Sequence, residues 1–108
     1  MLDQTTFQGS SAFEQLRHSS DKLILVEVGA PHCGSCATLK PVLEQLAIDH
    51  QGSFHLVEVD MTEDPELAVE LGVRSVPTVV LFKGDQLIDR IVGLKPKKLY
   101  SDSIQKSL

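Results

Sequence analysis

The sequence predicts an α/β fold in which βαβα is followed by ββα, with a central mixed sheet and helices on both faces. Two nearly unbroken apolar runs, residues 23–28 and 54–59, have the composition of strands buried on both sides. Each run is followed by residues with helical spacing or helix-start signals. Two more apolar runs flank the short turn Lys83–Gln86, a pattern typical of a β-hairpin. The first half should therefore be parallel, and the hairpin should add an antiparallel pair.

The first elements follow from their caps and apolar spacing. Ser10 and Ser11 precede an apolar stretch ending at Leu16 and predict a short helix with a hydroxyl cap. The strand at residues 23–28 leads into a helix from Cys33 to about His50. Pro41 lies inside this helix and is expected to kink it.

A short helix ends the first half, and the hairpin and a closing helix make up the second half. Asp64 is a predicted N-cap with Pro65 at the first helical position. The hairpin strands are residues 78–82 and 87–92. The closing helix begins at Pro96, and its thin apolar face consists of Leu99, Ile104 and Leu108.

Length and charge limit the classes of function. The 108 residues are expected to form one domain, residues 1–108, and to act as a monomer. The net charge of −5 argues against nucleic acid or an anionic membrane as the main partner. No run approaches the roughly 20 apolar residues that cross a bilayer, and residues 1–6 lack the pattern of a secretory leader. A cytoplasmic location is therefore expected.

The most informative feature is the segment Cys33-Gly34-Ser35-Cys36, which contains both cysteines of the chain. It lies where a buried strand passes into a helix, the setting of redox-active thiol pairs. A pair of metal ligands is the alternative, but two cysteines supply only two of the roughly four ligands of a structural zinc, and no second pair exists. No metal is therefore expected.

The position of each thiol predicts its role. Cys33 lies at the exposed helix start, where free N–H groups and the helix dipole favour a thiolate, and is the predicted nucleophile. Cys36 lies one turn further on, should be more buried, and is the predicted resolving thiol. Ser35 is expected to donate hydrogen bonds toward the Cys33 sulfur and make the potential less reducing. His32, as an imidazolium, would also favour the thiolate; a solvent-exposed contact residue is the alternative.

These features together resemble the thioredoxin family, over nearly the whole chain. The matching features are a C-G-x-C motif after the first long strand, a proline inside the helix, a cis-proline segment, a hairpin turn, a glycine after the last strand and a buried acid: Cys33–Cys36, Pro41, Arg74–Thr78, Lys83–Gly84, Gly93 and Glu27. The chain departs from the family at four places. Ser35 replaces a proline, Gly29 and His32 replace tryptophans, Glu27 replaces an aspartate, and Glu58 stands where many members have a lysine.

The resemblance implies the thioredoxin fold and further roles at the site. Burial should raise the pKa of Glu27, and by resemblance Glu27 would exchange a proton with Cys36 through water. Glu58 in the neighbouring strand would raise one of the two pKa values further. By resemblance, a cis Pro77 would lie against the disulfide.

The same resemblance implies a docking surface for the substrate. A substrate segment would pair with the backbone of Val76 as a short added strand. Ala30, Pro31, Gly34 and Gly93 would complete a shallow apolar rim around the disulfide, with His32 as a further contact.

The expected function is reduction of disulfides in other proteins by dithiol–disulfide exchange through Cys33 and Cys36. No cofactor beyond the cysteine pair is expected. The expected partners are disulfide-containing proteins and, by resemblance, a thioredoxin reductase or another electron donor. Two alternatives stay open: a disulfide oxidase or isomerase with a less reducing potential, and a non-enzymatic module that binds a partner with the same surface.

Overall fold

The computed structural model describes residues 6–19 and 21–108. The expectation that the chain has no secretory leader concerned residues 1–6, of which residues 1–5 lie outside the described part. Within the described residues nine elements follow one another: β1 (Thr6–Gln8), α1 (Gly9–Ser19), β2 (Leu23–Gly29), α2 (Gly34–Asp49), β3 (Phe54–Asp60), α3 (Pro65–Glu70), β4 (Thr78–Lys83), β5 (Gln86–Val92) and α4 (Lys97–Ser107). None of the helices described is long and apolar enough to cross a membrane.

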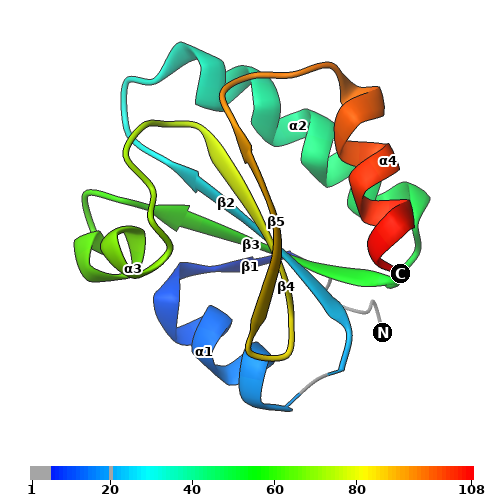
Figure 1. The fold of residues 1–108 in the computed structure, drawn as a ribbon. Coiled ribbons are helices and arrows are strands. Elements are labelled where there is room, and N and C mark those ends of the chain that lie inside the picture. The colour runs from blue at the N-terminus through cyan, green and yellow to red at the C-terminus, as the bar shows by residue number, and fades with distance from the viewer. Residues whose placement is uncertain (1–5, 20) are drawn as a thin grey trace.

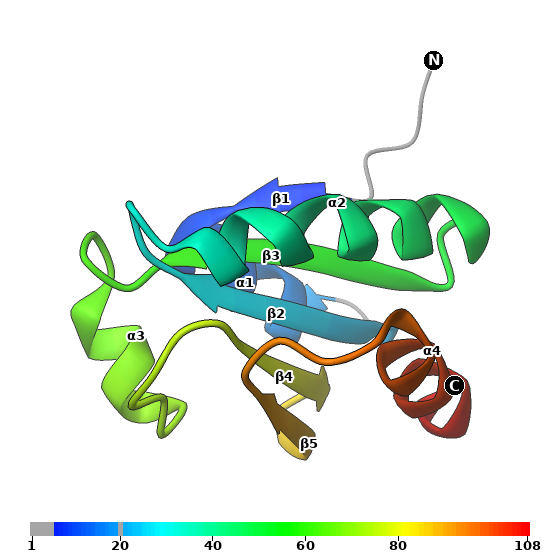
Figure 2. The same cartoon turned by 90° about the horizontal axis from the view of Figure 1, so that it is seen from above.

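The strands form one mixed sheet in the order β1-β3-β2-β4-β5. The strands β1 and β2 run parallel to β3, whereas β4 is antiparallel to β2 and β5 is antiparallel to β4. Helices α2 and α4 cover one face of the sheet, and α1 and α3 cover the other (Figures 1 and 2). This arrangement confirms the predicted α/β class, the parallel first half and the antiparallel hairpin.

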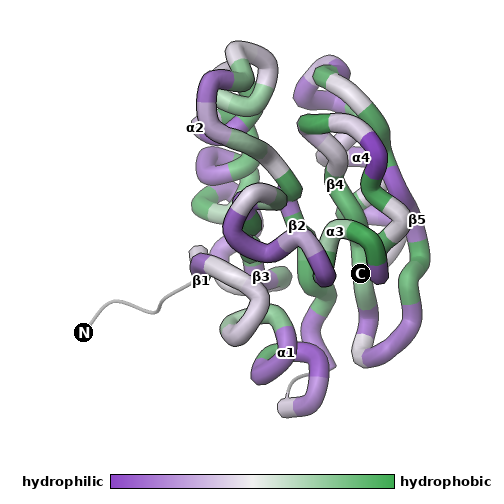
Figure 3. The backbone as a smooth tube through the Cα atoms, turned by 90° about the vertical axis from the view of Figure 1, so that its left-hand side faces the viewer, coloured by the Kyte–Doolittle hydropathy of each residue, from purple (hydrophilic) through white to green (hydrophobic). Residues whose placement is uncertain are grey.

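Successive side chains along each strand point to opposite faces of the sheet, and this divides the core into two layers. In β2, Leu23 and Leu25 pack toward α2 and α4, whereas Ile24, Val26 and Val28 pack toward α1 and α3. Successive residues can all be buried because helices cover both faces of the strand. Hydrophobic and hydrophilic segments alternate along the α2 tube in Figure 3, as expected for a helix with one face on the sheet.

Helix α2 determines where the redox segment lies. Its inner face consists of Leu39, Leu43 and Leu46, all almost fully buried against the sheet. Pro41 lies within the helix, as predicted. Cys33 occupies the N-cap position, so the packing of the helix holds its first turn at the carboxyl end of β2.

The amino-terminal region differs from the prediction. The three-residue strand β1 was not predicted, because it lacks the apolar run of a buried strand. Helix α1 starts at Gly9, so Ser10 lies inside it. Asp64 holds the N-cap position of α3 but makes no side-chain capping bond to that helix. Its carboxylate instead accepts hydrogen bonds from the Ser10 hydroxyl (2.8 Å) and the Ser10 N–H (3.2 Å), and so caps α1.

The predicted apolar face of the closing helix is also partly wrong. Leu99 and Leu108 are exposed, and only Ile104 of the predicted three is buried. Tyr100 and Ser103 complete the buried face. The Tyr100 hydroxyl donates to the Gly93 carbonyl and accepts from the Lys95 N–H, both at 3.0 Å, so an aromatic residue with a satisfied hydroxyl fills this layer.

Leu43→Ala should lower the free energy of unfolding by about 2–5 kcal/mol, because a fully buried leucine leaves a cavity when truncated. Urea unfolding followed by far-ultraviolet circular dichroism measures the loss, since the chain has no tryptophan. The matched control is Ile48→Ala, at an exposed position of the same helix. Equal losses in the two variants would contradict the packing of α2 described above.

Candidate active site

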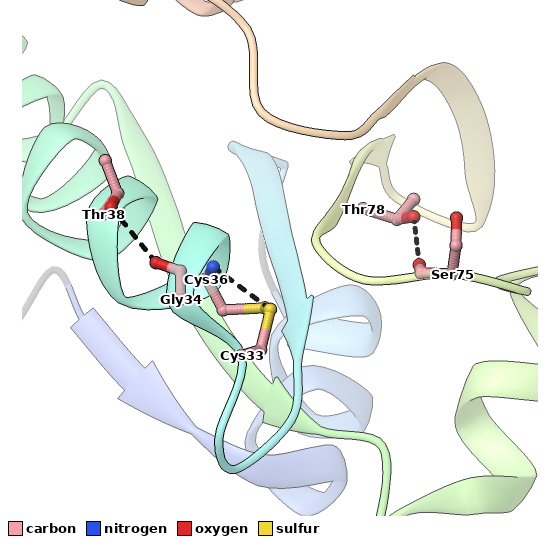
Figure 4. The surroundings of a disulfide bond; sticks show 6 residues. All are labelled: Cys33, Gly34, Cys36, Thr38, Ser75 and Thr78. Atoms are coloured by element: carbon pink, nitrogen blue, oxygen red, sulfur yellow. Dashed lines mark hydrogen bonds between the residues drawn. A yellow bond between two sulfur atoms is a disulfide. The ribbon is translucent and has the colours of Figure 1, made fainter.

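Cys33 and Cys36 form a disulfide, with their Cα atoms 5.2 Å apart (Figure 4). Cys33 has an extended backbone at the N-cap of α2, and its sulfur accepts a hydrogen bond from the Cys36 N–H at 3.2 Å. Cys33 is half-buried, whereas Cys36 is only 8% exposed. The order of exposure is as predicted. The N-cap position and the N–H of Cys36 in the first turn favour the thiolate of the outer sulfur when the bond opens.

The residues around Cys33 are exposed. His32, Gly34 and Ser35 all face solvent, and His32 has a left-handed backbone with φ of 62°. The hydrogen bond to the Cys33 sulfur comes from Cys36 in this oxidised state. The expected donation by Ser35 concerns the reduced state and stays a prediction. The three residues lie where a partner protein approaching the disulfide would meet them.

The segment before β4 lies at the same end of the sheet as the disulfide. Thr78 pairs with Val28, the next-to-last residue of β2, and its hydroxyl donates to the Ser75 carbonyl at 2.7 Å (Figure 4). The Val76–Pro77 peptide bond is cis, as expected. The Gly93 N–H donates to the Pro77 carbonyl at 2.8 Å and ties the end of β5 to this segment.

Glu27 is a buried carboxylate on the α2 face of the sheet. It is 5% exposed, and within the described chain its Oε1 atom has no hydrogen-bond partner. Burial raises its pKa to about 7, and the neighbouring Glu58 contributes in the same direction. Lys40 lowers the same pKa but does not cancel these effects. The carboxyl group therefore gains and loses a proton near neutral pH, as a general base requires.

Glu58 is the register partner of Glu27 in the parallel pair β2–β3, so the predicted proximity of the two acids is confirmed. Its Oε1 atom accepts a hydrogen bond from Gln8 Nε2 at 2.6 Å and lies 3.7 Å from Lys40 Nζ. Burial raises the pKa of Glu58, and the ammonium of Lys40 opposes this shift. Glu44, one turn beyond Lys40 on α2, raises it further.

A cleft of about 580 Å³ connects these groups with solvent. The two cysteines, the two buried acids and Lys40 all line this cleft. Gly29 keeps the cleft open beside the inner sulfur. A Cβ at this position would lie 3.4 Å from the Cys36 sulfur, so any larger side chain would fill the space between sulfur and cleft. Cys36 and the two carboxylates thus share one cleft that is open to solvent.

Two residues of this site were not predicted from the sequence. Lys40 lies four residues after Cys36, so helical spacing places both on one side of α2, and this signal could have indicated it. Gln8 belongs to the unpredicted strand β1 and had no such signal. Within residues 6–19 and 21–108, no group of three or more His, Cys, Asp or Glu side chains could hold a metal ion.

A disulfide at the start of a helix that packs on a mixed sheet is the arrangement of a thiol–disulfide oxidoreductase, and this is the class of protein that the fold and the site indicate. The comparisons with known proteins agree. A sequence profile described as Thioredoxin matches residues 4–106. Thioredoxin 1 of Nostoc sp. is 39% identical over 98 residues, which cover 91% of this chain and 92% of that protein. The solved structure of a mutant thioredoxin from Halobacterium salinarum NRC-1 superposes with a TM-score of 0.83 at 32% identity, covering 96% of this chain and 89% of the other.

This chain belongs to the thioredoxin family, and its fold is the thioredoxin fold. A third relative, NADPH-dependent thioredoxin reductase 3 of Arabidopsis thaliana, is 38% identical over 101 residues. The match covers 94% of this chain but 19% of that protein, so the similarity concerns one segment of a larger enzyme.

Glu27→Gln should stabilise the oxidised protein relative to wild type as the pH rises. The unfolded carboxyl loses its proton near pH 4.5 and the folded one near 7, so between these values the folded state holds the extra proton and rising pH favours unfolding. The stability gap between variant and wild type should grow by about 3 kcal/mol from pH 4.5 to 8.

Urea unfolding at a series of pH values measures this gap. The matched control is Glu63→Gln, at an exposed residue that lines the same cleft. A gap that stays constant with pH for Glu27→Gln would contradict the raised pKa of the buried carboxyl.

Proposed function

We propose that this protein reduces disulfides in other proteins by dithiol–disulfide exchange. The observation that carries the proposal is the unequal placement of the two bonded sulfurs. Cys33 lies at the open start of α2, and Cys36 lies behind it, buried at 8% exposure. An outer sulfur that reacts with partners and an inner one that releases them are the two parts that exchange requires.

The reaction starts from the reduced pair. The Cys33 thiolate attacks a sulfur of the partner's disulfide, which forms a mixed disulfide and expels the partner's second thiolate. Cys36 then loses its proton and attacks the Cys33 sulfur. The Cys33–Cys36 bond forms, the bond to the partner breaks, and the partner leaves with two thiols. Two electrons pass to the partner, and the protein ends in the oxidised state described above.

Glu27 acts in the second half-reaction. Its carboxylate lines the same cleft as Cys36, and its pKa of about 7 lets it accept the Cys36 proton at neutral pH. A water molecule in the cleft would carry the proton over the remaining distance. The cysteine pair performs the chemistry with no further cofactor.

The segment containing Val76 serves as the docking edge for the substrate. Val76 is half-buried, and it lies at the end of the sheet where the disulfide is. Pairing through the backbone would accept many substrate sequences. The half-buried Gly93 and the exposed His32 and Gly34 would border the approach to Cys33.

A thioredoxin reductase is the proposed electron donor. Support comes from the similarity of this chain to one segment of a thioredoxin reductase. Continued reduction of substrates fits a compartment that is kept reducing, such as the cytoplasm.

Oxidation or isomerisation of disulfides is the second candidate function. It is favoured by Ser35, which lies exposed in the first turn of α2 where the family has a proline without an N–H. The reduction potential decides between the two directions of exchange.

Cys36→Ser should react once with a protein disulfide and remain covalently attached, because the residue that releases the partner is gone. Insulin serves as the substrate and dithiothreitol as the electron source. The variant's insulin turnover should fall to the rate of dithiothreitol alone, and mass spectrometry without reductant should detect the adduct. Cys33→Ser is the matched control and should form no adduct. An adduct on Cys36 in that control, or wild-type protein that never reduces insulin, would contradict the proposal.

Ser35→Pro should make the reduction potential more negative, by a few tens of millivolts. The serine N–H and hydroxyl can stabilise the Cys33 thiolate of the reduced state, and proline removes both donors. A change of 30 mV corresponds to about 1.4 kcal/mol, the size of one charge-assisted hydrogen bond. Equilibration with glutathione buffers measures the potential. An unchanged or less negative value for the variant would exclude this role of Ser35.

A further inference from the structure

Two carboxylates share one buried location above the sheet. Glu27 and Glu58 are register partners on neighbouring parallel strands, whose backbones lie about 4.8 Å apart. Each glutamate lies two residues after a leucine of the cluster that packs against α2, Leu25 or Leu56. Because side chains alternate along a strand, both glutamates point to the same face as these leucines. They are 5% and 9% exposed, and water therefore screens their mutual repulsion poorly. Ionising both at once is therefore unfavourable, because the charge on either carboxylate disfavours the charge on the other.

The surroundings of the pair are unequal. Glu58 Oε1 accepts a hydrogen bond from Gln8 at 2.6 Å and lies 3.7 Å from the Lys40 ammonium. Both neighbours favour the ionised form of Glu58. Glu27 Oε1 has no hydrogen-bond partner in the described chain, and neither does Glu58 Oε2. The geometry thus favours the charge on Glu58 and the proton on Glu27.

Other charged or titratable groups also act on Glu27. From α2 come Lys40, which favours its ionised form, and Glu44, which disfavours it. From α4 comes Tyr100, whose own pKa is raised, chiefly by burial and in part by Glu27. The strand β4 contributes Val79 opposite Glu27, which does not titrate. Among the groups that act on Glu27, Glu58 is the negatively charged register partner in the sheet, and Lys40 carries the positive charge.

We propose that Glu58 and Lys40 are positioning residues for the second half-reaction, in which they set the proton affinity of Glu27 in opposite directions. This inference rests on the proposed function, because it concerns the step in which Cys36 attacks the mixed disulfide. The negative charge of Glu58 makes Glu27 a stronger base. The positive charge of Lys40 keeps Glu27 from holding its proton permanently.

The proton passes through the pair while the sulfurs exchange partners. The Cys36 thiol gives its proton to the Glu27 carboxylate, and the resulting thiolate attacks Cys33. The new disulfide forms as the partner's sulfur leaves with the electron pair of the broken bond and takes a proton from solvent. Glu27 then returns its proton to water through the cleft, which Lys40 and Glu58 also line. Neither Lys40 nor Glu58 touches the reacting sulfurs in this scheme.

The test isolates the second half-reaction in time. Reduced protein is mixed with 5,5′-dithiobis(2-nitrobenzoate) in a stopped-flow instrument. A first phase of absorbance reports attack by Cys33, and a second phase reports release of the remaining dye by Cys36. The rate of the second phase is measured from pH 5 to 9 for wild type, Glu58→Gln and Lys40→Met. Each substitution removes one charge and keeps the approximate size of the side chain.

The pH midpoint of the second phase is the decisive quantity. It should fall by about one pH unit in Glu58→Gln, because the repulsion that strengthens the base is lost. It should rise by about one unit in Lys40→Met. The control Glu63→Gln, at an exposed residue of the same cleft, should leave the midpoint unchanged. The first phase should keep its rate in all variants.

An unchanged midpoint in either charge variant would overturn the proposal. Circular dichroism checks that Glu58→Gln is folded. The Lys40 side chain is half-exposed, so Lys40→Met keeps the test decisive if Glu58→Gln fails to fold. Failure of this inference is distinguishable from failure of the proposed function. Insulin reduction by wild type with unchanged midpoints in the variants would reject only the roles of Glu58 and Lys40, whereas absence of insulin reduction would reject the function itself.

Discussion

The packing of α2 on the sheet is the constraint on which the site depends. Three leucines on the inner face of the helix are almost fully buried, so the helix that carries the first turn is held against β2. That turn places one sulfur outward at the N-cap and the other inward beside Gly29. A looser helix would let both sulfurs exchange environments, and the difference in reactivity between them would be lost. The chemistry of the pair therefore depends on the rigidity of the apolar layer beneath it.

The same layer makes the acid pair costly to keep. Two carboxylates occupy positions that alternation assigns to the core, where apolar side chains would stabilise the fold better. Gln8 and Lys40 both contact Glu58 and offset part of this cost there, whereas Glu27 gains only the more distant charge of Lys40. The unequal compensation leaves Glu27 with a proton that it can release near neutral pH. The burial that destabilises the fold at this point is therefore also what raises the proton affinity of Glu27.

Local patterns were sufficient to predict much of this architecture. The buried strands, α2 and the hairpin were predictable because each contains its own periodic or turn signal, and the redox segment because both cysteines lie at one element boundary. Strand β1 is too short and too polar to show such a signal. The bond from Asp64 to Ser10 joins residues 54 positions apart, and Gln8 reaches Glu58 over 50 positions. Such contacts depend on strand order and register, which local sequence does not determine.

The bond between Asp64 and Ser10 connects the amino-terminal helix with the loop that walls the cleft. Gln8, just before that helix, holds one oxygen of the acid pair. Residues 8–10 are thereby in direct contact with the acid pair and with the wall of the cleft. A truncation that removed Gln8 would therefore alter the electrostatics of the acid pair, although Gln8 lies far from the cysteines in sequence.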